Sequence, residues 1–154
     1  MTAVRVERAV PAPPRRAFAH FWSIERLREG WPSITTFAVL HEDGAHQEAR
    51  MSVLRDGAVE EIRIIRFRRG LDIEFFNPEP PPMMTWHRGA WRFRPLAGGC
   101  LIAAEREYDL RRRDGETESQ LLDRELSFQG ALEARLGEIL ASFHPGEATC
   151  CSSI

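Results

Sequence analysis

The chain has 154 residues, a formal net charge of −2, 43% hydrophobic residues and 29% charged residues, which is the balance of one soluble globular domain. A nearly neutral chain has no electrostatic attraction for nucleic acid or an anionic membrane, and no apolar run reaches the ~18 residues that cross a bilayer. All 21 basic residues are arginines, so a lysine Schiff base is excluded.

The N-terminus and the cysteines favour a cytoplasmic protein. The first ten residues, "MTAVRVERAV", alternate apolar and charged residues and lack the apolar centre of a signal peptide. Cys100 stands alone and Cys150 and Cys151 are adjacent, which is not the spacing of a disulfide framework.

In chain order, a short strand over residues 3–10 precedes two short helices. Pro13 and Pro14 suit a first helical turn, and Phe18, Phe21 and Trp22 follow at helical spacing. The segment "SIERLREG", residues 23–30, predicts a second helix that begins with a serine cap and ends at a glycine.

The middle of the chain predicts an antiparallel meander of about six strands. Runs of about ten residues rich in Val, Ile, Phe and Trp alternate with turn signals. Asp-Gly and Gly-Gly pairs in these turns are typical of two-residue hairpins, because both central positions often need a positive φ. These signals are Asp43-Gly44, Asp56-Gly57, Arg69-Gly70, Gly98-Gly99 and Asp114-Gly115.

Residues 117–143 predict one long helix, and Pro145 and Gly146 end it. We expect the helix to dock through a stripe of apolar residues, namely Leu122, Leu126, Leu132, Leu136, Ile139, Leu140 and Phe143. The chain therefore divides into one domain over residues 1–144 and a flexible C-terminal tail over residues 145–154.

This order of elements predicts an α+β fold, in which a curved antiparallel sheet of about seven strands surrounds the long C-terminal helix. Such an arrangement often leaves a ligand cavity between sheet and helix. Strand alternation turns His87, Trp91 and Phe93 inward, with Gly89 leaving room beside the rings. On the same argument Met83 and Thr85 share their face, Met84 lies on the outer face, and Arg106 and Tyr108 point inward from the next strand.

The segments "APPRRAFAHFW", "WPSITTFAVL", "HEDGAHQEARMSV", "DGAVEEIRIIR" and "HRGAWRFRPLAGG" occur in this order and spacing. Together they resemble the START-like, helix-grip superfamily, and within it the single-domain aromatase/cyclases of bacterial type II polyketide synthases. The resemblance spans residues 4–143. It implies a deep cavity that folds a poly-β-ketone chain, promotes an aldol cyclisation and dehydrates the product.

The resemblance places the key pocket arginine at Arg66 and two pocket tryptophans at Trp31 and Trp91. An arginine fork can bind carbonyl or enolate oxygens, His87 could move a proton near neutral pH, and Tyr108 could donate to a developing alkoxide. The predicted catalytic residues are Arg66, His87 and Tyr108. The predicted substrate-binding residues are Trp31, Glu60, Ile64, Phe75, Trp91, Phe93, Arg106 and Gln129.

Structural explanations stay open beside these roles. Glu60 could pair with Arg66 or Arg106 to satisfy a buried charge, His87 could bond a neighbouring strand or a water, Tyr108 could bond the helix, and Trp91 could be core. His41 and His46 flank a hairpin without a known metal motif, so we expect no metal and no cofactor.

Two further functions stay open as well. The same fold could bind a lipid, hormone or finished aromatic product without catalysis, and the family's tyrosine after Trp-Pro falls on Phe37 or Ala38 here, which favours that alternative. Hydrolysis or dehydration of a small aromatic substrate is a weaker one. The expected partners are a polyketide-like small molecule and an acyl carrier protein, with the chain a monomer or homodimer.

Overall fold

The computed structural model describes residues 1–145, apart from the side chain of Leu27. The elements in chain order are β1 (Thr2–Val10), α1 (Pro14–Trp22), α2 (Ile24–Glu29), β2 (Ile34–Glu42), β3 (His46–Arg55), β4 (Ala58–Arg69), β5 (Asp72–Phe76), β6 (Met84–Leu96), β7 (Gly99–Leu110) and α3 (Glu118–Ala141). No helix among these is long and apolar enough to cross a membrane. Residues 146–154 of the predicted tail, with Cys150 and Cys151, lie outside the described residues.

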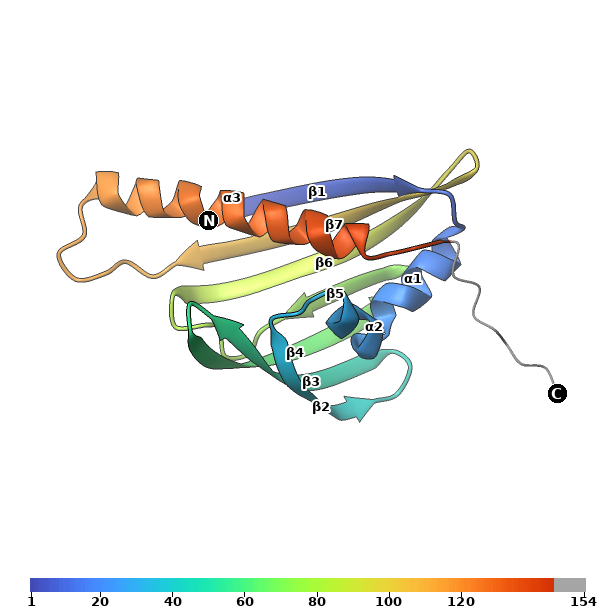
Figure 1. Ribbon diagram of the computed structural model, residues 1–154, viewed down its shortest axis with the longest axis horizontal. Coiled ribbons are helices and arrows are strands. Elements are labelled where there is room, and N and C mark those ends of the chain that lie inside the picture. Colours follow the sequence, from blue (N-terminus) through green and yellow to red (C-terminus); the bar gives the residue numbers. More distant parts are fainter. Residues whose placement is uncertain (146–154) are drawn as a thin grey trace.

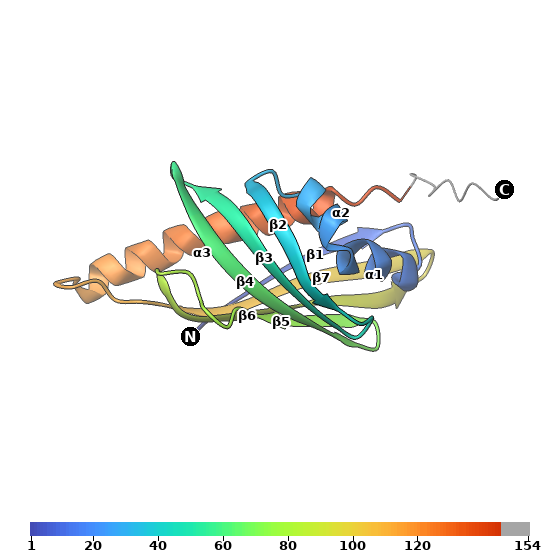
Figure 2. The same cartoon turned by 90° about the horizontal axis from the view of Figure 1, so that it is seen from below.

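The seven strands form one antiparallel sheet in the order β1-β7-β6-β5-β4-β3-β2. The strands β2 to β7 are a simple meander, and β1 closes the order by pairing with β7. Figure 1 shows α3 along β1 and β7, with α1 and α2 near its C-terminal end. Figure 2 shows how strongly the sheet turns, since β2 to β4 cross the direction of β6 and β7. The predicted α+β helix-grip architecture is confirmed.

Local sequence signals determine several element boundaries. Asp56 and Gly57 have φ values of 48° and 77°, so they form the two-residue turn that was predicted between β3 and β4. Ser23 caps α2 by accepting a hydrogen bond from the backbone N–H of Arg26. Thr117 and Gln120 form a reciprocal capping box at the start of α3.

The core lies between the concave face of the sheet, α1 and the C-terminal part of α3. Phe21 of α1 is fully buried, stacks on Trp91 with ring centroids 4.6 Å apart, and packs near Phe93 at 5.9 Å. Leu136, Leu140 and other apolar side chains of α3 complete this cluster. Packing between the aromatic rings of α1 and β6 therefore holds α1 against the sheet, at the end of the domain where the two short helices lie.

The N-terminal half of α3 does not dock as predicted. Leu122 and Leu126 are 54% and 59% exposed, while Leu136, Ile139 and Leu140 are buried. A helical face that contains Leu136 and Leu132 continues four residues earlier through Phe128, which is half-buried, and so misses Leu126. Figure 1 also shows the first turns of α3 extending beyond the start of β1, where there is no strand to pack against.

The start of β6 departs from the predicted alternation. A register shift between Met84 and Trp86 inserts an irregularity into the pairing with β7. Met84 is consequently buried and Thr85 exposed, the reverse of the predicted order. The alternation of inward and outward side chains resumes after the irregularity, so Trp91 and Phe93 face the core as expected.

Truncating the buried end of α3 should destabilise the domain, whereas truncating its exposed start should not. Leu136→Ala should lower the free energy of unfolding by about 2–5 kcal/mol, because a side chain that is 1% exposed leaves a cavity. Leu126→Ala is the matched control and should change it by less than about 0.5 kcal/mol. Denaturant titration measures both, and equal losses would show that α3 packs differently.

Candidate functional site

A row of inward-facing residues crosses the concave face of the sheet. Backbone pairing places one residue from each of six neighbouring strands in this row. In the order β3, β4, β5, β6, β7 and β1, these residues are Gln47, Arg66, Phe75, Gly89, Arg106 and Val4. On the neighbouring row His87 of β6 pairs with Tyr108 of β7. The register therefore brings together residues that are far apart in the sequence, such as Val4 and Arg106, with two arginines, one imidazole and one phenol on a single face.

Arg106 is a buried cation held mainly by aromatic rings. Its guanidinium carbon lies 4.6 Å from the ring centre of Phe75 and 4.8 Å from that of Trp91. One of its N–H groups donates to the backbone carbonyl of Glu105 at 2.7 Å, and the side chain is 7% exposed. Within residues 1–145 no carboxylate forms an ion pair with it. Burial and repulsion from Arg66 lower its pKa to about 9, so it stays charged at neutral pH.

Gly89 creates the space in which this cation and its rings lie. A Cβ at this position would be 2.4 Å from the carbonyl oxygen of Glu105 and 2.6 Å from the ring of Phe75. Backbone cannot retreat from such a contact, so any larger residue would displace the ring that Arg106 covers. The prediction that Gly89 leaves room beside the rings is confirmed.

Asn77 fixes the tautomer of His87, and burial keeps the imidazole neutral. The side-chain nitrogen of Asn77 donates to the carbonyl of Arg63 at 2.9 Å, which leaves its oxygen to accept from His87 Nδ1 at 2.5 Å. His87 Nε2 is thereby a lone-pair acceptor, and it is buried without a hydrogen bond from the described residues. Burial first, then the charges of Arg106 and Arg55, lower its pKa to about 3. The sequence-based expectation of titration near neutral pH is therefore not supported.

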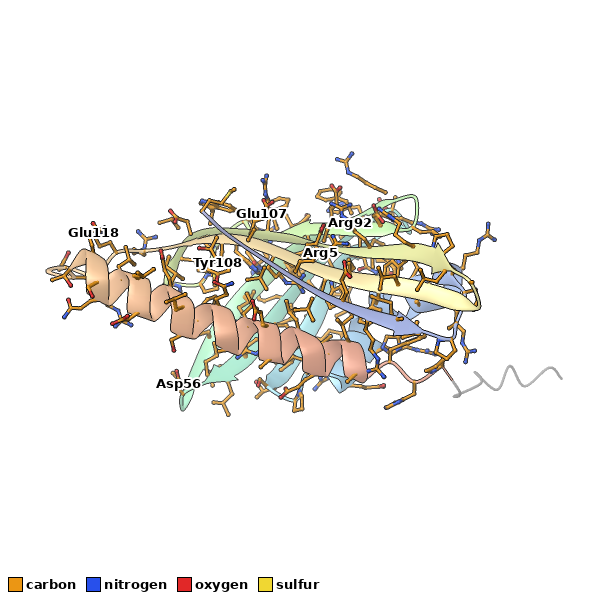
Figure 3. The ribbon with its side chains drawn as sticks, turned by 90° about the horizontal axis from the view of Figure 1, so that it is seen from above. Arg5, Asp56, Arg92, Glu107, Tyr108 and Glu118 are labelled. Carbon is orange, nitrogen blue, oxygen red and sulfur yellow. The ribbon has the colours of Figure 1, made fainter. Side chains whose placement is uncertain are left out.

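Tyr108 is fully buried, and its hydroxyl forms no hydrogen bond with the described residues. Its ring meets Phe128 of α3 edge to face, with centroids 5.0 Å apart. Burial and the carboxylates of Glu125 and Glu133 raise its pKa, so the phenol stays protonated. Figure 3 shows the neighbours Glu107 and Tyr108 on opposite sides of β7, with Tyr108 on the side of α3.

Arg66 is engaged differently from the role that the resemblance implied. Its NH1 donates to the carbonyl of Trp22 at 3.1 Å and to Gln47 Oε1 at 3.0 Å, and its NH2 donates to the carbonyl of Phe21. The side chain is 1% exposed, and burial lowers its pKa to about 9. With both terminal nitrogens bonded to α1 and β3, Arg66 anchors the C-terminal end of α1 to the sheet. These contacts favour a structural role over a catalytic one.

Other predicted site residues divide between the core and the surface. Glu60 pairs with Arg55 at 3.6 Å, which corrects the expected pairing with Arg66 or Arg106. Ile64 and Phe93 belong to the core cluster. Gln129 is half-buried and donates to Glu133 on its own helix at 3.2 Å.

Trp31 follows α2 and lies near α3. Its indole N–H is buried without a hydrogen bond among residues 1–145, and the guanidinium of Arg135 lies 5.8 Å from its ring centre. A buried N–H donor without an acceptor costs free energy, which makes Trp31 the fourth inward polar group after Arg106, His87 and Tyr108 that a ligand could satisfy.

Two hollows are resolved on the surface. One of about 950 Å³ lies between α1, α2 and the ends of the strands, and its lining includes Trp22, Gln47 and Arg68. The other, about 750 Å³, lies over β5, β6 and β7 and reaches Phe75, Gly89 and Arg106. Neither lies between the concave face and α3, so a continuous cavity lined by His87, Trp91 and Tyr108 stays a prediction.

Three contributing residues were missed from the sequence. Asn77 is the single asparagine of the chain and sets the His87 tautomer, but it was not among the predicted site residues. Gln47 and Phe128 were not considered, and only the register and the path of α3 bring them to Arg66 and Tyr108. The alternation of β3 was the one signal that pointed to Gln47.

Comparisons with known proteins place the fold. The di-domain aromatase/cyclase StfQ from the steffimycin biosynthetic pathway matches with a TM-score of 0.79 and 18% identity over 91% of this chain and 48% of StfQ. The Zhui aromatase/cyclase from Streptomyces sp. R1128 matches with a TM-score of 0.72 and 16% identity over 92% of this chain and 93% of Zhui. A START superfamily protein from Mycobacterium smegmatis matches with a TM-score of 0.62 and 14% identity over 89% and 98% of the two chains.

No protein-family model and no curated protein matches the chain. The structural matches show that the chain has the START-like, helix-grip fold, and polyketide aromatase/cyclases are among its structural neighbours. Identities of 14–18% establish the fold alone.

The lowered pKa of His87 predicts a loss of stability in acid. Between pH 6.5 and 3 the unfolded chain binds a proton at this residue that the folded protein does not, so stability falls as pH falls through this window. Unfolding free energies of the wild type and His87→Gln should converge or cross on acidification, with a slope difference of up to about 1.4 kcal/mol per pH unit. His144→Gln, at an exposed site after α3, is the control, and equal slopes for wild type and His87→Gln would contradict the assignment.

Proposed function

We propose that this protein is a polyketide aromatase/cyclase, which directs aldol cyclisation and dehydration of a poly-β-ketone. One observation carries the proposal: Arg106 is a buried charge without an acidic partner in the described chain, beside two buried polar atoms that lack hydrogen bonds, His87 Nε2 and Tyr108 Oη. Isolated groups of this kind destabilise a fold, and they cluster where a ligand supplies the missing partners.

The proposed first step removes a proton from a carbon between two carbonyl groups. His87 Nε2 accepts that proton, and Arg106 donates hydrogen bonds to the enolate oxygen that gains the charge. The neutral imidazole suits this step, because Asn77 already holds the proton on Nδ1 and leaves the Nε2 lone pair available. A negative enolate beside His87 raises the pKa of the imidazole, which offsets the effect of burial.

In the second step the enolate carbon attacks a distant carbonyl carbon, forming the new C–C bond and an alkoxide. Tyr108 donates its phenolic proton to this oxygen and recovers a proton from the imidazolium of His87. Loss of that hydroxyl with a proton from the adjacent carbon releases one water and forms the double bond. Phe75 and Trp91 limit how the flexible chain folds before the ring closes.

The structural neighbours support this chemistry. StfQ and Zhui are both aromatase/cyclases, and their folds extend over nine-tenths of this chain. The corresponding substrate would be a poly-β-ketone attached to an acyl carrier protein. We propose this carrier as the partner and Arg106, His87 and Tyr108 as the catalytic residues, with Trp31, Phe75 and Trp91 contacting the substrate.

One observation favours a second function, binding of a finished aromatic product without catalysis. With a pKa of about 3, His87 is a weak base in the unliganded protein. The groups that support catalysis, a cation between two rings and isolated hydroxyl and imidazole groups, would also bind the carbonyls and phenols of an aromatic product.

Reconstitution with a minimal polyketide synthase tests the proposal. The quantity measured is the ratio of correctly cyclised product to spontaneous shunt products. Arg106→Gln and Arg106→Lys should each lower this ratio by about 10²-fold, because the enolate loses a well-placed donor or its two-pronged geometry. Tyr108→Phe should have a smaller effect in the same direction.

The matched control is Arg88→Lys, which alters an exposed arginine on the opposite face of the same sheet. It should leave the ratio unchanged. Arg66→Lys should instead lower thermal stability, because Arg66 holds the carbonyls of α1. If the wild type leaves the product ratio unchanged yet binds a finished aromatic product tightly, the cyclase proposal fails and the binding function replaces it.

A further inference from the structure

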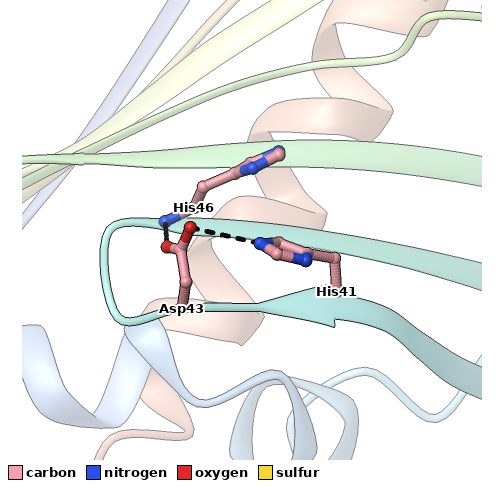
Figure 4. Close-up of side chains that lie close together, drawn as sticks. All are labelled: His41, Asp43 and His46. Carbon is pink, nitrogen blue, oxygen red and sulfur yellow. Dashed lines mark hydrogen bonds and ion pairs between the residues drawn. The ribbon is translucent and has the colours of Figure 1, made fainter.

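The hairpin between β2 and β3 brings together three side chains that can bind a metal ion. His41 lies near the end of β2, Asp43 begins the turn and His46 starts β3. One ligating atom from each lies within 4.8 Å of the other two. Figure 4 shows His41 and Asp43 in contact, with His46 following from the same turn. The spacing His-x-Asp-x₂-His is not a known metal motif, and the turn is what unites the three.

The turn leaves one oxygen of Asp43 directed at His41. Asp43 Oδ1 accepts hydrogen bonds from the backbone N–H groups of Ala45 and His46, at 3.0 and 2.8 Å. The other oxygen, Oδ2, lies 3.1 Å from His41 Nε2.

The distances suit a tetrahedral zinc ion. With bonds of about 2.0–2.1 Å, two ligand atoms of tetrahedral Zn²⁺ lie roughly 3.3 Å apart. His41 Nε2 and Asp43 Oδ2 already have nearly this separation. Both side chains are about half exposed, so small rotations suffice to bring in the third ligand. The ion would replace the proton that now lies between His41 and Asp43.

The ring of His46 is held in place by its neighbours. It stacks on Phe67 of β4, with centroids 5.1 Å apart and planes 7° from parallel. Its Nε2 lies 3.6 Å from Glu48 Oε1, and Glu48 is the cross-strand partner of His41. A fixed imidazole lowers the entropy cost of coordination, and Glu48 places a second carboxylate within reach of the ion.

We propose that His41, Asp43 and His46 form a binding site for a divalent transition-metal ion of the zinc type, with Glu48 as an adjacent oxygen donor. Two imidazoles and a carboxylate are a common zinc ligand set, and they leave a fourth position for water. The site lies on the opposite face of the hairpin from Gln47, which binds Arg66 and the carbonyl of Trp22. Metal binding would therefore stiffen the hairpin that anchors α1. This proposal does not depend on the cyclase function.

Calorimetric titration of the 154-residue protein with ZnCl₂ at neutral pH tests the site. The parent protein for all measurements carries Cys150→Ser and Cys151→Ser, because two adjacent thiols bind zinc by themselves. We expect one site per chain. His41→Ala, His46→Gln and Asp43→Asn should each weaken binding by at least about 10-fold, since even outer-shell partners contribute that much.

Asp43→Asn is the most informative variant, because its amide oxygen can still accept the two turn N–H bonds while the charge is lost. His144→Ala, an exposed histidine outside the hairpin, should bind Zn²⁺ like the parent. Zn²⁺ should also raise the melting temperature of the parent and not that of His46→Gln. Unchanged affinity in all three hairpin variants, or no saturation up to about 1 mM Zn²⁺, would overturn the proposal.

Discussion

Burial of the Arg66 charge within the fold is the constraint on which the rest of the structure depends. A desolvated guanidinium is costly without hydrogen-bond acceptors, and here the two terminal nitrogens of Arg66 donate to the carbonyls of Phe21 and Trp22 and to the amide oxygen of Gln47. Those carbonyls end α1, where the helix dipole presents its negative pole. The interaction thus fixes α1 against β3 and β4, and with it the ring of Phe21 that stacks on Trp91.

The two buried arginines of the same row differ in what surrounds them. Arg66 is bonded to the helix and to β3, whereas Arg106 has one backbone acceptor and two ring faces. Rings attract a cation but cannot replace hydrogen-bond acceptors. The difference supports an anchoring role for Arg66 and the proposed role of Arg106 in ligand recognition, and it is the reason why the proposed oxyanion donor lies on β7 and not on β4.

The β2–β3 hairpin extends from the buried contacts of Arg66 to the surface of the protein. Its inner side carries Gln47, which bonds Arg66, and its outer side carries His41, Asp43 and His46. Both sets of residues belong to two paired strands joined by a short turn, so the proposed ion would restrict the residues on the inner side. The hairpin is therefore the place where a surface ligand could influence the α1 end of the domain.

The sequence by itself determined the order of the elements, the hairpin turn at Asp56-Gly57, and the inward faces of β7 and of β6 beyond its irregular start. Each depends on local chemistry, such as the positive φ of Gly57 or the alternation that buries Trp91 and Phe93. It also identified His87, Arg106 and Tyr108 as inward polar residues, because a period of two is independent of the partner strand, whereas the family resemblance indicated Arg66. The order of the elements also predicted the curvature of the sheet around a long helix.

Tertiary structure alone decided which partner each inward group has. Arg66 meets carbonyls of α1 because the path of the chain after Trp22 places them there, and no strand pattern encodes that path. Asn77 reaches His87 through the β5–β6 register, and burial then lowers the imidazole pKa. Leu122 and Leu126 are exposed because the start of α3 extends beyond β1, which depends on where β1 begins in space. The periodicity of a sequence specifies which side chains share a face. The partners and the burial of those side chains depend on the residues that the rest of the chain places against that face.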